Sequence, residues 1–287
     1  MYNLRYHVAS LVAVFLALTV GLVLGTVVAE RGTLDEQSAA LVEDLQKQFD
    51  AIQKDNQSLR EGLERDRAFA ADVVPAVTAG ALDGRTVAVL VNSGRSSGLE
   101  AAVTAIENAG GTPVVFTFES AQLGLGDQTP DGLVSLLGAG VSGTPDAIGK
   151  AAADRMAAEW LLEGEHPVTD LLVDAGELTV RGASATTTVD ACVLMAAFSG
   201  EPDVVAVAMA QAFDEGGVTV VGAEATSQVT GVAAEAVDRG LSAVDDIDAP
   251  QGAFSLVWLL SNRATGYYGV GSGVDAVYPA PQVKATE

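Results

Sequence analysis

Hydrophobic and polar residues divide the chain into three parts. The first is an uninterrupted apolar run, VASLVAVFLALTVGLVLGTVVA, which extends from Val8 to Ala29 and contains no charged residue. In a helix the 22 residues of this run span about 33 Å, which is enough to cross the hydrocarbon core of a bilayer. We therefore expect residues 1–29 to form a transmembrane anchor.

A cleaved signal peptide is the alternative, because Val27 and Ala29 could precede a peptidase site. The run is longer than the roughly 7–15 apolar residues of a signal core, which favours an uncleaved anchor. Arg5 before the run gives a small preference for a cytoplasmic N-terminus. We expect a single-pass cell-membrane protein with the bulk of the chain outside the cytoplasm.

A heptad pattern follows the apolar run. Its inner positions recur with alternating gaps of 4 and 3 residues and are Leu45, Phe49, Ile52, Asn56, Leu59 and Leu63. Such a pattern is typical of a short coiled coil, and a polar Asn at one inner position favours two parallel strands, where it pairs with its own copy. Thr33 and Glu36 form a capping box, which predicts a helix start at Thr33.

We expect residues 30–79 to form this coiled-coil helix and a linker, and the chain to be a homodimer. The alternative is an amphipathic helix that packs on its own domain.

Beyond residue 80, strand-like apolar runs alternate with helix-like segments. Strands are expected at 85–91, 112–118, 189–197 and 218–224, and helices at 98–110, 144–164 and 201–217. This alternation predicts a mainly parallel, doubly wound α/β domain over residues 80–287. The loop NSGRSSG (92–98) follows the first strand, but its glycines do not match the G-x-G-x-x-G or P-loop spacing of nucleotide sites.

Charge narrows the range of functions. The chain carries 15 Lys and Arg against 38 Asp and Glu, and its formal net charge is −23. Such a surface repels phosphate backbones, so we expect no nucleic-acid partner. No G-x-S-x-G, H-E-x-x-H or C-x-x-C motif occurs, and the single Cys192 cannot form an internal disulfide. We therefore expect no enzyme activity, catalytic residue, cofactor or bound metal.

Three aspartates, Asp245, Asp246 and Asp248, precede the helix-like segment that begins at Pro250. Asp248 lies just before Pro250 and Gln251, which predicts that it caps this helix. Capping does not explain Asp245 and Asp246. We expect those two in a solvated loop, as candidates for contact with a partner protein.

Three stretches carry a resemblance: MYNLRYHVASLVAVFLALTVGLVLGT, LSAVDDIDAPQGAFSLVWLL and GYYGVGSGVDAVYPAP. They resemble the start and end of the actinobacterial MctB family, also called copper transport protein B, which includes SteB-like cell-envelope proteins. The closing stretches match at Val244, Asp245, Asp248, Pro250, Gly252, Tyr268, Gly269 and Val270. Tyr268 and Gly269 are therefore further candidates for partner contact.

The resemblance implies a role in copper efflux or tolerance at the cell envelope. Its SteB-like branch implies a dimeric scaffold that binds a membrane partner and regulates cell-wall remodelling in division. It implies no catalytic residue.

The amino-acid sequence provides few side chains that could bind copper. Copper(I) prefers thiolate and thioether ligands, and the chain has one Cys and four Met with no clustered pair such as M-x-x-M. Met156, Met195 and Met209 all lie in apolar patterns that are typical of a core. We therefore expect any role in copper handling to be indirect.

Overall fold

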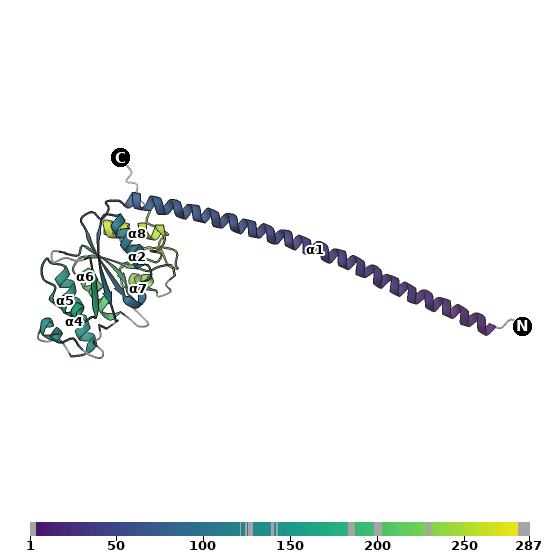
Figure 1. Cartoon of the computed structure of the whole chain (residues 1–287), viewed down its shortest axis with the longest axis horizontal. Helices are drawn as coiled ribbons and strands as arrows, with labels where there is room; N and C mark the ends of the chain where they lie inside the picture. Colours follow the sequence, from purple (N-terminus) through teal and green to yellow (C-terminus); the bar gives the residue numbers. More distant parts are fainter. Residues whose placement is uncertain are drawn as a thin grey trace. The chain divides into compact units, whose positions relative to one another are not determined.

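The computed structural model describes residues 4–120, 122–123, 125, 129–138, 141, 143–182, 187–197, 203–227 and 231–280, apart from the side chains of residues 4–5 and 29–40 (Figure 1). The chain forms two compact units, residues 1–66 and residues 67–287.

The first unit consists of helix α1 (Leu4–Thr78), whose last turns belong to the second unit. Within α1, the segment Tyr6–Val28 is long and apolar enough to cross a membrane, and its side chains are not buried by other parts of the chain. The predicted helix start at Thr33 is wrong, because α1 runs through that position without a break. Gly32 and the capping box at Thr33 are local signals, and they do not interrupt the backbone of α1.

The predicted seam lies on an exposed face of α1. Its five apolar side chains are 52–73% exposed: Leu45, Phe49, Ile52, Leu59 and Leu63. The Asn56 side-chain amide donates a hydrogen bond to the Ile52 carbonyl (2.9 Å), within the same helix. An apolar stripe of this kind is available for pairing, and the coiled coil itself remains a prediction.

The second unit is built on a sheet, of which the described residues form seven strands in the order β3-β2-β1-β4-β5-β6-β7. The β2–β3 pair is antiparallel and all the other pairs are parallel. The strands are β1 (Thr86–Asn92), β2 (Thr112–Phe118), β3 (Leu178–Arg181), β4 (Ala191–Met195), β5 (Thr219–Ala223), β6 (Ser242–Val244) and β7 (Tyr267–Tyr268). The prediction of a mainly parallel, doubly wound sheet is confirmed.

Helices cover both faces of the sheet (Figure 1). One face packs on α2 (Leu99–Asn108) and α8 (Pro250–Asn262), toward which β1 directs Val87, Val89 and Val91. Ala88 and Leu90 alternate with them and face the other layer. The helices on that side are α3 (Leu133–Leu137), α4 (Pro145–Trp160), α5 (Pro167–Asp174), α6 (Val204–Glu215) and α7 (Val232–Asp238).

Candidate functional site

Doubly wound sheets commonly bind ligands where the strand order reverses, beyond the carboxyl ends of the strands. Here that point lies between β1 and β4, and the side chain of Asp203 is held there. Its carboxylate accepts hydrogen bonds from Asn92 Nδ2 (2.9 Å), Arg95 Nη1 (3.0 Å) and the Ala197 amide (2.6 Å). Asp203 is 1% exposed. The chain's own carboxylate therefore occupies donors that could otherwise bind a ligand anion.

The loop after β1 closes tightly over the sheet. Gly98 precedes α2 with a φ of +83°, and a side-chain carbon at this position would lie 2.8 Å from Ile247 Cγ2 and 3.1 Å from Ala225 Cβ. The start of α2 thus packs directly on the loops that follow β5 and β6. This close packing does not favour a phosphate site at the start of α2.

Asp245 organises the closing segment of the domain. Its carboxylate accepts hydrogen bonds from the Val270 amide (2.7 Å), the Gly271 amide (2.9 Å) and the Tyr267 hydroxyl (3.0 Å). Burial raises the pKa of Tyr267, and the bond to Asp245 raises it further. The carboxylate leaves no room for a side chain at Gly269, where an added Cβ would overlap it. The Asp245 amide also donates to the Tyr268 carbonyl (3.2 Å).

Asp246 is buried in a different way. It is 0% exposed, and neither of its carboxylate oxygens has a hydrogen-bond partner. Burial raises its pKa to about 6, and the neighbouring carboxylates of Asp245 and Asp248 also raise it. The Gln251 side chain lowers the pKa, although it does not reach hydrogen-bonding geometry with either oxygen.

The expectation of a solvated loop at Asp245 and Asp246 is therefore wrong. The backbone stays paired beyond β6, since the Ile247 amide donates to the Glu224 carbonyl (3.1 Å), and this pairing keeps both residues inside the domain. With Asp245 6% exposed and Asp246 fully covered, neither side chain is available for direct contact with a partner protein.

The predicted role of Asp248 as a helix cap is also wrong. Ala249 is the N-cap residue of α8, with no side-chain cap, and Pro250 is the first helical residue. Asp248 Oδ1 instead accepts hydrogen bonds from the Thr226 amide (2.7 Å) and hydroxyl (2.8 Å). Partial burial would raise the pKa of Asp248, but these bonds outweigh it and, with nearby Arg67, lower the pKa below its usual value.

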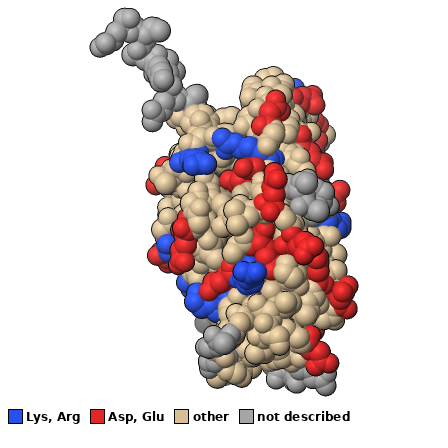
Figure 2. Space-filling view, turned by 90° about the vertical axis from the view of Figure 1, so that its left-hand side faces the viewer, with Lys and Arg blue, Asp and Glu red and all other residues tan. Residues whose placement is uncertain are grey.

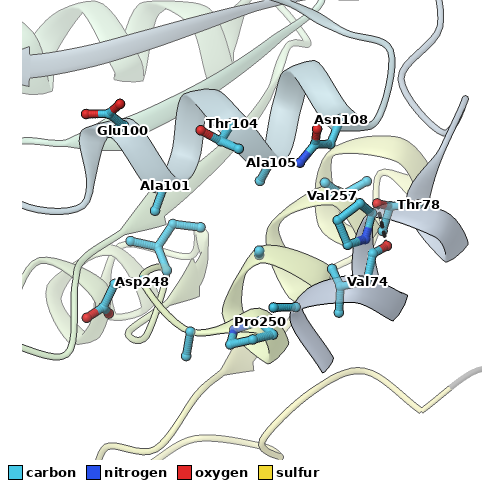
Figure 3. A pocket seen from close by; sticks show the side chains of 15 residues that line it. Val74, Thr78, Glu100, Ala101, Thr104, Ala105, Asn108, Asp248, Pro250 and Val257 are labelled. Carbon is cyan, nitrogen blue, oxygen red and sulfur yellow. Dashed lines mark hydrogen bonds between the residues drawn. The ribbon is translucent and has the colours of Figure 1, made fainter. Parts of the chain in front are cut away.

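A groove of about 270 Å³ lies beside Asp248, within the second unit (Figure 3). Three segments line it: the last turns of α1, the exposed side of α2, and residues 247–257 at the start of α8. Most lining side chains are apolar and small, among them Val74, Ala101 and Val257. In Figure 3, Glu100 and Asp248 lie toward the left-hand end of the groove.

Sequence patterns do not reveal this groove, because its walls come from segments that are far apart in the chain. The small residues that line it, Ala71, Ala101, Ala105 and Ala253, belong to ordinary helical patterns when each segment is considered alone.

Within the described part of the chain, the thiol and thioether side chains that suit copper(I) lie in the core of the second unit. Four of them are 0–2% exposed: Met156, Cys192, Met195 and Met209. Burial raises the pKa of the Cys192 thiol, which keeps it protonated. His166 stacks on Trp160, with ring centroids 4.0 Å apart and planes within 1°. Across the described part of the chain, no three or more His, Cys, Asp or Glu residues are grouped as metal ligands.

Acidic side chains spread across the middle and right-hand edge of the face in Figure 2, with few basic ones among them. The excess of carboxylates therefore appears on the folded surface as well as in the composition. Hard cations and cationic partners are attracted to such a surface, whereas phosphate-rich polymers are repelled.

Comparison with known proteins identifies a family for the chain. Neither a curated protein nor a solved structure matches the chain. The model of one family, described as "Copper transport outer membrane protein, MctB", matches residues 1–279. That description does not mention cell-wall remodelling, so the SteB-like alternative stays a prediction. Because the match extends over nearly the whole sequence, the chain belongs to the MctB family of copper transport proteins.

Proposed function

We propose that this chain serves copper transport at the cell envelope as a membrane-anchored contact protein, without carrying copper on its own side chains. The observation that carries this proposal is the burial of Cys192 and the three core methionines. Copper(I) needs accessible soft ligands, and a thiol must lose its proton to bind a metal. Here the thiol is buried and its pKa is raised.

The family match and the apolar helix Tyr6–Val28 support a place at the membrane. We extend this to a single span with a cytoplasmic N-terminus and the α/β domain outside. One span cannot enclose a pore. The chain would then act on copper movement through a partner.

The groove beside Asp248 is the proposed contact surface. Its apolar lining would receive apolar side chains, and the carboxylates of Glu100 and Asp248 would favour a Lys or Arg next to them. The lowered pKa of Asp248 keeps that carboxylate charged. The matching partner is a protein segment with apolar side chains and a neighbouring positive charge.

The second candidate is a dimeric scaffold, which the exposed seam on α1 favours. Its inner positions follow the heptad spacing, and Asp55 and Arg60 occupy flanking positions where opposite charges can pair between two chains. Dimerisation and groove binding are compatible, so this candidate can hold together with the first.

The groove can be tested by blocking it. Thr104 is exposed on α2 and lines the groove, so Thr104→Trp should fill it without disturbing the core. Glu107→Trp, on the same helix but outside the groove, is the matched control. In a deletion strain challenged with copper, the control should restore wild-type tolerance and Thr104→Trp should not. Equal restoration by both variants would remove the groove from the proposal.

Direct copper binding is tested separately. The purified full chain in detergent should not withdraw Cu(I) from a chromophoric chelator, and Met209→Leu should restore copper tolerance as well as the wild type. Stoichiometric, tight binding of Cu(I) to the wild-type chain would overturn the proposed indirect role.

A further inference from the structure

We propose that Asp246 is a pH-sensitive latch, which holds the α8 wall of the groove in place when its carboxyl group is protonated and loosens that wall when it is ionised. The importance of this latch for partner binding rests on the proposed function of the groove, but the latch can be tested without any partner.

The first observation is the packing around Asp246. The residue is fully covered, and both of its carboxylate oxygens lack hydrogen-bond partners. Gly252, in the first turn of α8, packs so closely that a side-chain carbon there would overlap the Asp246 backbone and lie 2.6 Å from Oδ1. A carboxylate in such a place loses its hydration without receiving protein donors in return, which disfavours its charged form.

The second observation is the sign of the charges around this residue. The titratable groups that act on Asp246 are the carboxylates of Asp245 and Asp248, and both favour its neutral form. Glu224, which follows β5, and Asp245 both raise the pKa of Tyr267 in β7, so this side adds no positive charge. Arg67 acts on Asp248 from the end of α1. Burial, together with the charges of Asp245 and Asp248, raises the pKa of Asp246 to about 6 against the lowering effect of the Gln251 side chain.

The third observation connects this residue to the groove. The Asp246 carbonyl accepts a hydrogen bond from the Ala249 amide (2.8 Å), and the Ala249 carbonyl in turn accepts one from Ala253 (3.0 Å). Ile247, Ala249, Pro250 and Ala253 line the groove. Gly252, one residue before Ala253, packs against the covered Asp246 side chain, so exposing its carboxylate to water requires the start of α8, and with it this wall of the groove, to move.

Ionisation and movement of the wall are consequently linked. In an open state the Asp246 carboxylate would be hydrated, with a pKa near the ordinary value of about 3.8. Because the closed state binds the proton more tightly, lowering the pH favours the closed state and raising it favours opening. The change should occur between about pH 4 and pH 6 and level off above that range.

Hydrogen exchange on the full chain in detergent tests this directly. After correction for intrinsic exchange rates, the protection of amides in residues 247–253 should fall by about sixfold for each unit of pH between 4.5 and 6. Asp246→Asn cannot ionise and should abolish this dependence. Asp238→Asn, which replaces an exposed carboxylate at the end of α7, is the control and should retain it.

Protection that does not change with pH in the wild type, or the same dependence in Asp246→Asn, would overturn the latch. If Asp246→Asn does not fold, a carbon NMR titration of wild-type aspartate carboxyl groups decides the question. One carboxyl group should titrate about two pH units above the ordinary pKa of aspartate. If no carboxyl group does so, the latch is wrong. Neither measurement depends on the groove having a partner, so the latch and the proposed function can fail independently.

Discussion

Replacing Asp246 by Asn should make the stability of the second unit less dependent on pH. The pKa of this carboxyl group is about 6 in the folded chain, against an ordinary value of 3.8. A difference of roughly 2 units corresponds to about 3 kcal/mol between the two protonation states. Because the folded pKa is raised, the stability contributed by the protonated form is fully present below about pH 4 and is lost as pH rises through about 6.

The sign of the effect follows from this linkage. At pH 7.5 the wild type carries the full cost of a buried carboxylate, about 3 kcal/mol, whereas at pH 4.5 it carries only about 1 kcal/mol. Asn is neutral at both values. The free energy of unfolding of Asp246→Asn, measured relative to the wild type, should therefore rise by about 2 kcal/mol between pH 4.5 and pH 7.5.

Urea unfolding of the full chain in detergent, at several pH values, measures this difference. The unpaired amide of Asn has a cost of its own, on the order of 1–3 kcal/mol, but that cost is the same at every pH. The diagnostic quantity is thus the change with pH in the free energy of unfolding of the variant relative to the wild type. The size of that difference at any single pH is not diagnostic. A difference between variant and wild type that stays constant from pH 4.5 to 7.5 would refute the reasoning.

Three further predictions concern other parts of the chain. Asp245→Ala should destabilise the second unit by about 3 kcal/mol or more in urea unfolding, because it removes three hydrogen bonds to one carboxylate and leaves the buried Tyr267 hydroxyl unpaired, whereas Tyr267→Phe, which removes one hydroxyl group, should cost only about 1 kcal/mol; equal costs would contradict this. The wild-type chain in detergent should sediment as a dimer, and a variant with Ala at Leu45, Ile52 and Leu59 should sediment as a monomer. If the wild-type chain is itself a monomer, the coiled-coil prediction is wrong. Mass spectrometry of the native protein should find residues 1–29 still attached, and a mature N-terminus at Glu30 would mean that the apolar run is a cleaved signal.

The central strands of the sheet could be predicted from sequence because each is a run of five to seven mostly apolar residues, as in β1 and β4. The edge strands could not be predicted in this way. Strand β6 has three residues and β7 has two, which is too short to show any period, and β3 pairs antiparallel at the opposite edge. Helix α5 and helix α7, with eight and seven residues, are also too short for a clear pattern.

The aspartate cluster shows why local signals gave the wrong site. Asp248, Pro250 and Gln251 match a helix start, but Thr226 offers Asp248 two donors from a loop 22 residues earlier in the chain. A sequence pattern cannot weigh a tertiary partner against a local one. The burial of Asp245 and Asp246 likewise depends on Gly252, Val270 and other residues that approach only in the folded domain.

The contact between Asp245 and the closing glycines has a consequence for how this family can vary. A side-chain carbon at Gly269 or at Gly271 would occupy space that the Asp245 carboxylate already fills. A larger residue at either glycine position therefore requires a smaller one at position 245, and the hydrogen bonds of that carboxylate are then lost together. Positions 245, 269 and 271 should consequently co-vary as one unit across homologous sequences, although more than twenty residues separate the aspartate from the glycines.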